Sequence, residues 1–344
     1  MKKNYKLYSN EIVFRGHPDK VCDQISDALL DAYLQGDKNS RCGIETMGGK
    51  GVIFVTGEVT SNTEVDVEIV VKRVLADVGY PTDYAIVDNL GKQSNDIARG
   101  VDVGGAGDQG MRFGYACNDT YENLPTAMVI LQKLSMTYDR IRRGDDRFHA
   151  DGKAQITGIY DENMKLQKIK TFTVSYSNTE KERKATDEII KAVCTNICKE
   201  HNIEIEEFLI NPTGKFSVWG FDGDAGLTGR KIVVDNYQSF ANVGGGCFSG
   251  KDATKVDRSA AYKARQIAVE HLHLYGLKWC EVQLSYAIGK AEPLAIYINS
   301  DKGSITPDEL LYEECTPRNI IKDLDLLNVK YEETAKFGHF PFMD

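Results

Sequence analysis

Two glycine-rich loops that carry charges of opposite sign are the parts of this sequence best suited to chemistry. The first is residues 105–110, GAGDQG, and the second is residues 244–252, GGGCFSGKD. Glycine lets the backbone approach a ligand closely and turn its N–H groups toward it. A lysine at the end of such a loop suits a phosphate chain, and nearby aspartates suit the divalent metal that accompanies it. The sequence therefore indicates a site for a nucleotide polyphosphate.

Two generic nucleotide-binding motifs overlap these loops, but neither is complete. Gly105, Gly107 and Gly110 have the dinucleotide-binding spacing, yet residues 99–104 do not resemble a buried strand, and Asp108 would lie beside a pyrophosphate. Residues 245–251 match a Walker A loop until its last position, where Asp252 replaces Ser or Thr. We therefore expect neither a Rossmann fold nor a standard P-loop fold.

Cations and carboxylates surround the two loops. Lys251, Lys255 and Arg258 alternate with acidic residues, and a second basic pair follows the glycine-rich turn at 223–229. Further members of this charged set are Asp252, Asp257, Arg230, Lys231, His17, Asp19, Lys20 and Lys153. Lys and Arg can neutralise phosphate oxygens, and carboxylates can hold the magnesium that accompanies a triphosphate. The set as a whole favours a triphosphate.

The composition narrows the class of protein. A chain of 344 residues with 42% hydrophobic and 27% charged residues should fold into two or three globular units. A net charge of −9 disfavours a general nucleic-acid binder, and the apolar stretches are too short for a membrane span. No apolar run follows the amino-terminal residues, so we expect no signal peptide. No cysteine pair has the CxxC spacing of a zinc or redox motif, and free thiols without a targeting segment indicate a reducing cytoplasm. Cys194 and Cys198 are predicted to be two buried thiols on one helix face.

The periodicity of the sequence predicts an α+β fold. Helices are expected from Pro18, from a capping box at Ser61 and Glu64 to Val78, and over 125–144, 180–199 and 256–275, with another starting at Thr306. Strands are expected over 52–58, 171–176, 231–235, 280–286 and 294–298. This pattern suggests three similar mixed domains in a pseudo-threefold arrangement, with boundaries at 1–100, 101–219 and 220–344.

The sequence resembles the S-adenosylmethionine synthetases (methionine adenosyltransferases) over most of its length. The matching segments, in the order of that family, are 16–20 (GHPDK), 23–28 (DQISDA), 91–94 (GKQS), 105–110 (GAGDQG), 151–153 (DGK), 210–214 (INPTG), 223–231 (GDAGLTGRK), 244–252 (GGGCFSGKD), 255–262 (KVDRSAAY) and 285–289 (SYAIG). The resemblance implies attack of the methionine sulfur on C5′ of ATP, followed by hydrolysis of the bound triphosphate to pyrophosphate and phosphate. It also implies two Mg²⁺ ions per site, K⁺, and a homodimer or tetramer with active sites between subunits.

The same resemblance assigns roles to individual residues. The expected catalytic residues are His17, Lys153, Arg230 and Lys251. ATP and its phosphates are expected to contact His17, Asp151, Lys153, Lys215, Phe216, Asp224, Arg230, Lys231, Cys247 and Lys251. Methionine is expected to contact Glu58, Gln93, Asp108, Asp224, Lys255 and Ile288. The expected metal ligands are Asp19 and Asp257 for Mg²⁺ and Glu45 for K⁺.

The chain also departs from the family pattern. Phe14-Arg15 stands where Ser-Glu is usual, and Lys215, Cys247 and His149 replace the usual Arg, Ala and Arg. The stretch from Gln93 to Gly105, a lid in the family, is shorter. Two alternatives therefore accompany the synthetase hypothesis: an ATP-binding tripolyphosphatase without alkyl transfer, and a non-catalytic regulatory subunit. The second alternative fits less well, because Asp19, Asp257, Lys251 and Lys153 are all present.

Overall fold

Three copies of one strand–helix pattern follow each other along the chain. The computed structural model describes residues 5–92, 105–179 and 182–340. The first copy consists of β1 (Lys6–Val13), α1 (Pro18–Gly36), β2 (Arg41–Gly49), β3 (Val52–Thr60), α2 (Val67–Val78) and β4 (Ala85–Gly91). The second consists of β5 (Gly110–Cys117), α4 (Thr126–Gly144), β6 (Phe148–Tyr160), β7 (Leu166–Asn178), α5 (Arg183–Glu200) and β8 (Ile205–Ile210).

The third copy is the most irregular. It consists of β9 (Gly226–Leu227), α6 (Ile232–Asp235), α7 (Val256–Leu274), β10 (Trp279–Tyr286), β11 (Ala295–Ser300), β12 (Gly303–Ile305), α8 (Glu309–Glu314), α9 (Pro317–Asp323) and α10 (Tyr331–Thr334). The last strands of the first two copies, β4 and β8, are parallel to their neighbours, whereas β12 is antiparallel to β11. The prediction of an α+β fold with three similar units is confirmed.

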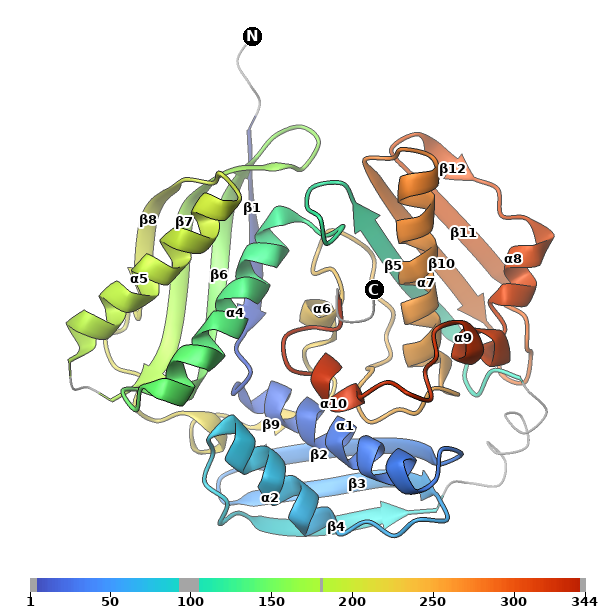
Figure 1. The fold of residues 1–344 in the computed structure, drawn as a ribbon, viewed down its shortest axis with the longest axis horizontal. Helices are drawn as coiled ribbons and strands as arrows, with labels where there is room; N and C mark the ends of the chain where they lie inside the picture. Colours follow the sequence, from blue (N-terminus) through green and yellow to red (C-terminus); the bar gives the residue numbers. More distant parts are fainter. Residues whose placement is uncertain (1–4, 93–104, 180–181, 341–344) are drawn as a thin grey trace.

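The first strand of each copy joins the sheet of another copy. The three four-stranded sheets have the orders β1-β6-β7-β8, β12-β11-β10-β5 and β4-β3-β2-β9. Thus β1 pairs with β6, β5 pairs with β10, and β9 pairs with β2, all antiparallel. Figure 1 shows the three sheets arranged around the middle of the molecule, with α1, α4 and α7 on their inner sides. Because the exchange is cyclic, the three units form one interlocked body.

This exchange bears on where the charged loops lie. The segments that leave the exchanged strands are 14–17 after β1 and 228–255 after β9, and residues 105–109 lead into β5. Most of the predicted phosphate ligands lie in or next to these segments. The domain boundaries at residues 100 and 219 stay a prediction. They divide the chain by position in the sequence, whereas each sheet takes strands from two copies.

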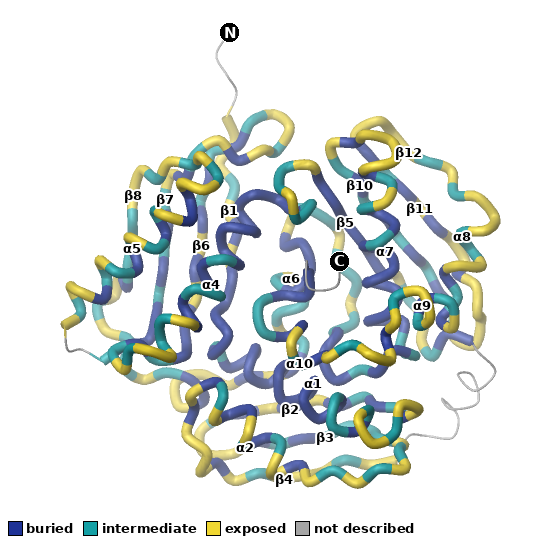
Figure 2. Tube along the Cα trace, in the orientation of Figure 1, coloured by how far each residue is buried: buried dark blue, intermediate teal, exposed yellow. Residues whose placement is uncertain are grey.

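A buried ion pair lies where α1 meets α7. The guanidinium of Arg258 donates to both carboxylate oxygens of Asp27, at 2.6 and 2.8 Å, and its carbon lies 4.1 Å from the centroid of the Tyr331 ring. Asp27 also accepts from the backbone N–H of Gly250 at 2.8 Å. Figure 2 shows that the buried segments gather between the three sheets. Arg258 therefore anchors the fold, and is not part of a solvated helix face.

Several local expectations need correction. Residue Ser61 does not cap a helix; Asp66 does, because its Oδ1 accepts from Ile69 N at 3.0 Å, and α2 begins at Val67. Residues 231–235 form no strand: α6 is a short helix packed near β1. Helix α8 is capped by Asp308, and not by Thr306, through a 2.9 Å bond from Leu311 N. The capping residue of α2 lies five residues after the expected one, and that of α8 lies two residues after it. For α6, tertiary packing decides the local structure.

The loop at 105–110 and the two cysteines of α5 agree with expectation. Residues 105–110 lead into strand β5 and not into a helix, so they form no Rossmann loop. Cys194 and Cys198 are both buried in α5, and burial raises the pKa of each thiol. Within 5–92, 105–179 and 182–340, no helix combines the length and the apolar character that a membrane crossing requires.

Candidate active site

His17 occupies the N-cap of α1, immediately after the turn that leaves β1. Its backbone is extended, and its Nδ1 accepts a hydrogen bond from Asp19 N at 3.2 Å. Burial lowers the pKa of His17 to about 4, with Lys231 contributing in the same direction. The ring is therefore neutral near pH 7, and because Nδ1 accepts, the proton resides on Nε2. His17 thus offers an Nε2–H donor to a ligand.

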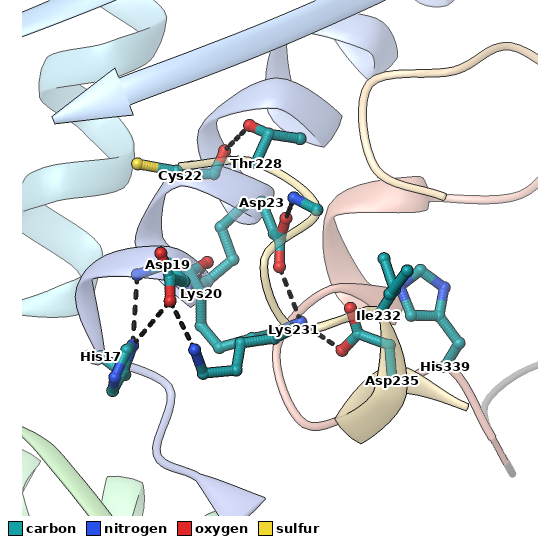
Figure 3. Close-up of polar contacts among 12 residues, drawn as sticks. His17, Asp19, Lys20, Cys22, Asp23, Thr228, Lys231, Ile232, Asp235 and His339 are labelled. Atoms are coloured by element: carbon teal, nitrogen blue, oxygen red, sulfur yellow. Dashed lines mark hydrogen bonds and ion pairs between the residues drawn. The ribbon is translucent and has the colours of Figure 1, made fainter. Parts of the chain in front are cut away.

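Asp19 contacts two cations, Arg230 and Lys231, close to this histidine. Its side chain is almost fully buried, and its Oδ1 accepts from the backbone N–H of Leu227 in β9 at 2.9 Å. Lys231 Nζ lies 2.5 Å from Oδ2, and Arg230 Nε lies 3.6 Å from Oδ1. Figure 3 shows contacts of Asp19 at the start of α1. The strand exchange that brings β9 to β2 therefore also brings Arg230 and Lys231 to Asp19.

Lys20, the next residue, has a structural role. Its buried Nζ lies 2.6 Å from Asp235 and 3.2 Å from Asp23, whose Oδ1 also accepts from Gly229 N at 2.9 Å (Figure 3). Burial alone would lower the pKa of Lys20, but the two carboxylates outweigh it and raise the pKa. Lys20 therefore ties α1 to α6, and it does not belong with the phosphate ligands.

Strand β6 adds an acid and a cation near His17. Asp151 is buried, and its Oδ2 accepts from Gly220 N at 2.9 Å. Burial raises the pKa of Asp151 to about 6, and the charge of Asp224 adds to this rise while Lys153 opposes it. Lys153 is exposed on β6 and is paired with Val13 in the sheet. We call the set His17, Asp19, Asp151, Lys153, Asp224, Arg230 and Lys231 the His17 cluster.

A second charged cluster lies at the start of α7. Asp257, which is buried, forms ion pairs with both Lys251 and Arg112. Arg112 also lies 3.9 Å from the exposed Asp108, and Lys255 lies 3.4 Å from Glu58 of β3. We call the set Glu58, Asp108, Arg112, Lys251, Lys255 and Asp257 the Lys251 cluster. Sequence reasoning missed Arg112, although it is a single charged residue in the otherwise uncharged strand GMRFGYAC.

The glycine-rich loop packs tightly against β2. At Gly250 φ is +82°, and a Cβ would lie 1.9 Å from the carbonyl oxygen of Ile44, so only glycine fits. Lys251 follows and forms an isolated bridge with Gly43. Cys247 packs against Gly229, and burial raises the pKa of its thiol to about 11. The thiol is therefore protonated at neutral pH, and Cys247 can line the site without acting as a nucleophile.

The remaining predicted ligands are spread over several elements. Exposed Ile288 follows β10 beside the GAGDQG loop, where Gly289 N donates to Ala106 O at 2.8 Å. Phe216 is half-buried, next to the exposed Lys215. Glu45 is exposed on β2, and Gln93 lies outside the described residues. His149 stacks on Trp219, with ring centroids 5.1 Å apart, and so supports the segment that precedes Asp224.

The two clusters are attached to different points of α1. Asp19 is in its first turn, whereas Asp27, which holds Gly250 and Arg258, is eight residues later. At 1.5 Å of rise per residue, these positions are about 12 Å apart along the helix. The His17 cluster has its cations beside the buried Asp19 and Asp151, and the Lys251 cluster has its cations beside the buried Asp257. Each resembles half of a polyphosphate site.

Three family models match the chain in tandem. The N-terminal domain of S-adenosylmethionine synthetase matches residues 5–96, its central domain matches 103–216, and its C-terminal domain matches 218–343. The three matches together span nearly the whole sequence, in the order of the family.

The chain belongs to the S-adenosylmethionine synthetase family.

Its activity is that of this family, the synthesis of S-adenosylmethionine from ATP and methionine. Enzymes of the S-adenosylmethionine synthetase family generally use metal ions. The cation-rich clusters fit this reaction, because the leaving group is a chain of phosphates. Neither alternative, the tripolyphosphatase or the regulatory subunit, is favoured.

A network of arginines and aspartates supports the turn that carries His17. The guanidinium of Arg15 forms an ion pair with Asp77 of α2 and lies 3.4 Å from Asp139 of α4. Arg142 and Arg143 also contact Asp139, at 2.5 and 3.0 Å, and Arg143 lies 3.1 Å from Asp77. Burial alone would raise the pKa of Asp77, but Arg15 and Arg143 outweigh it and lower the pKa to about 2.

The lowered pKa of Asp77 predicts part of the acid sensitivity of this synthetase. Its ion pairs stabilise the fold fully above the unfolded pKa of about 3.9, and this contribution is lost as the pH falls through about 2. The Asp77→Asn variant should therefore show a weaker pH dependence of unfolding free energy below pH 4, by up to about one proton. Urea titrations at several pH values measure this slope, with Glu68→Gln, an exposed acid of the same helix, as the control. An unchanged slope in Asp77→Asn would contradict the prediction.

Proposed function

We propose that the methionine sulfur attacks C5′ of ATP in a single displacement. The S–C5′ bond forms as the C5′–O bond breaks, and the electron pair of the broken bond leaves with the triphosphate oxygen. The bound triphosphate is then hydrolysed to pyrophosphate and phosphate before release. A thioether is neutral and needs no general base, so the rate must come from positioning and from stabilising the leaving group. The observation that carries this proposal is the concentration of cations around Asp19 and Asp257.

His17 is our candidate for the group nearest the bond that breaks. Its neutral ring keeps a proton on Nε2, so it can donate a hydrogen bond to the bridging oxygen as negative charge develops there. Lys153, Arg230, Lys231 and Lys251 would neutralise the phosphate oxygens further along the chain. The remaining ATP contacts are proposed to come from Asp151, Lys215, Phe216, Asp224 and Cys247.

The methionine subsite is proposed to lie on the Lys251 side. Glu58 carries a carboxylate that suits the substrate ammonium group, and Lys255, 3.4 Å from it, suits the substrate carboxylate. Exposed Ile288 offers an apolar surface to the thioether chain. Gln93, Asp108 and Asp224 complete the proposed set.

The acids fit Mg²⁺ that arrives with the triphosphate. Mg²⁺ prefers one or two carboxylates together with phosphate oxygens and waters. Asp19 and Asp257 each present one buried carboxylate among cations that would turn to the phosphates. In the part of the chain that the structure describes, no three His, Cys, Asp or Glu side chains gather as a complete metal site. We therefore propose Asp19 and Asp257 as Mg²⁺ ligands and Glu45 as a K⁺ ligand; the bound Mg²⁺ would supply charge for the leaving group.

The working unit is proposed to be at least a homodimer. The outer face of the sheet β4-β3-β2-β9 exposes Met47, Val52, Val87 and Leu227 by 36–52%, and α1 and α2 cover the opposite face. A second copy seated on this face would bring the His17 cluster of one chain toward the Lys251 cluster of the other, since Leu227 adjoins Asp19 and Glu58 lies on β3. We also propose the reducing cytoplasm as the location, because all eight cysteines are free.

An assay of product formation tests the proposed reaction. We expect the protein, ATP and Mg²⁺ to release phosphate and a sulfonium product only when methionine is present. Mass detection follows the sulfonium compound, and a coupled assay follows phosphate. Phosphate release from ATP or tripolyphosphate without any sulfonium product would instead support the tripolyphosphatase alternative, and no turnover of either kind would support the regulatory subunit.

A further inference from the structure

The turn that carries His17 is held by contacts on both sides of its backbone. Phe14 N donates to Gly152 O of β6 at 2.8 Å, and Gly16 O accepts from the hydroxyl of Tyr80 at 2.6 Å. A Cβ at Gly16 would lie 2.4 Å from the carbonyl oxygen of Ala150, so the turn lies flat on the strand. His17 therefore starts from a backbone with little freedom to shift.

Arg15 forms a closed pair with Gln24 of α1. The Arg15 Nε–H donates to Gln24 Oε1 at 2.7 Å, and Gln24 Nε2 donates back to the carbonyl oxygen of Arg15 at 2.9 Å. The same amide nitrogen also donates to Lys20 O at 2.8 Å. Both side chains are buried, Arg15 to 2% exposure and Gln24 completely. This pair fixes both the backbone and the side chain of Arg15 relative to the first turns of the helix that His17 caps.

The other end of the Arg15 guanidinium reaches two further helices. One nitrogen pairs with Asp77 near the end of α2, and another lies 3.4 Å from Asp139 of α4. A guanidinium can bond to three widely separated partners because its donors lie on three nitrogens of a rigid plane, whereas an ammonium group has all of its donors on one nitrogen. Arg15 thus contacts side chains of three helices, α1, α2 and α4, and it lies two residues before His17.

We propose that Arg15 is a positioning residue for alkyl transfer, which acts by fixing His17 against the bridging oxygen of the triphosphate. This inference rests on the proposed function. A displacement at carbon is sensitive to alignment, and a misplacement of about 1 Å can cost about 100-fold in rate. Binding of the phosphates is assigned to Lys153, Arg230, Lys231 and Lys251, which are cations outside the Arg15 network. Loosening the turn should therefore slow the displacement while leaving substrate binding nearly intact.

Substitution of Arg15 tests the inference, with Arg143 as a matched control. Arg15→Met removes every bond of the guanidinium, and Arg15→Lys keeps the charge beside Asp77 and Asp139 but cannot also hold Gln24. Arg143→Met removes a cation from the same two aspartates without touching the turn. In Arg15→Met we expect kcat for the sulfonium product to fall by about 10- to 100-fold, with KM for ATP and methionine changed by less than about threefold. Arg15→Lys should fall in between, and Arg143→Met should keep the wild-type kcat.

Two measurements separate a positioning role from a loss of stability. Thermal unfolding shows whether each variant is folded at the assay temperature, and hydrolysis of added tripolyphosphate reports the phosphate site without alkyl transfer. We expect the ratio of alkyl transfer to tripolyphosphate hydrolysis to fall in both Arg15 variants. Equal losses in Arg15→Lys and Arg143→Met, or a rise in KM at unchanged kcat, would overturn the inference. Absence of sulfonium product from the wild-type protein would instead overturn the proposed function.

Discussion

The Asp19→Asn variant should lose sulfonium formation almost completely, by about 1000-fold or more. The amide keeps the shape of the carboxylate, and its oxygen can still accept from Leu227 N, so the contact between α1 and β9 is retained. What is lost is the negative charge that holds Lys231 at 2.5 Å and Arg230 at 3.6 Å, together with a proposed Mg²⁺ ligand. Removing even one preorganised group that faces developing charge costs about 100- to 1000-fold in kcat, and this substitution disturbs all of these groups together.

The control for this variant is Asp66→Asn. Asp66 is also an acid at the start of a helix, where its Oδ1 caps α2, but it lies in a different helix from the His17 cluster. Both substitutions remove a charge that favours a helix N-terminus, which is worth about 0.3–1 kcal/mol. Steady-state rates of sulfonium formation, with unfolding midpoints, compare the two. Wild-type rates in a folded Asp19→Asn protein would remove Asp19 from the site.

A heterodimer of two inactive variants should regain about half of the wild-type activity per dimer, if each active site takes one cluster from each chain. Asp19→Asn damages the His17 cluster, and Lys251→Met damages the Lys251 cluster by removing one of the two partners of Asp257. A dimer of one chain of each kind then contains one site with both defects and one site with none. The two variants, carrying different affinity tags, are produced together, and the heterodimer is purified in two steps.

The comparison that decides this prediction is made at equal dimer concentration, with size measured by light scattering. Each variant alone should be a dimer with little activity. A heterodimer as inactive as its parents would mean that each site is built within one chain, where the two clusters are anchored about 12 Å apart along α1. A protein that is monomeric and fully active would contradict the proposed interface on the outer face of the β4-β3-β2-β9 sheet.

The fold could be predicted from sequence where local signals agree. The apolar period of α7 and the alternation of β10 predicted the correct elements: every second side chain of β10 is buried, and the apolar positions Ala260, Ala264, Ile267 and Ala268 of α7 all lie in the core. The β-branched residues of 231–235 favour a strand, but this segment forms α6, because Lys20 draws Asp235 into the core beside α1. The cyclic exchange of β1, β5 and β9 could not be predicted, because pairing partners far apart in sequence leave no local pattern.

For the site as well, residue types could be interpreted from the sequence, but contacts between residues far apart in the chain could not. The residue types around Asp19 and Lys251 indicated a triphosphate, since phosphate chemistry requires cations with interspersed acids. The role of Lys20 was misjudged, because only the folded chain reveals that Asp23 and Asp235 surround it. The contacts of Arg112 and Arg15 were missed, since each pairs with a partner at least nine positions away: Asp257 in one case, Gln24 and Asp139 in the other.

A single-turnover experiment tests the central claim most directly, namely that the site stabilises an intact triphosphate as it leaves C5′. Enzyme in excess over ATP is mixed with methionine and Mg²⁺, quenched with acid at successive times, and analysed for sulfonium product, tripolyphosphate, pyrophosphate and phosphate. We predict that tripolyphosphate appears together with an equal amount of sulfonium product, and then decays to pyrophosphate and phosphate. Phosphate or pyrophosphate that forms before any sulfonium product, with no tripolyphosphate at any time, would contradict the account.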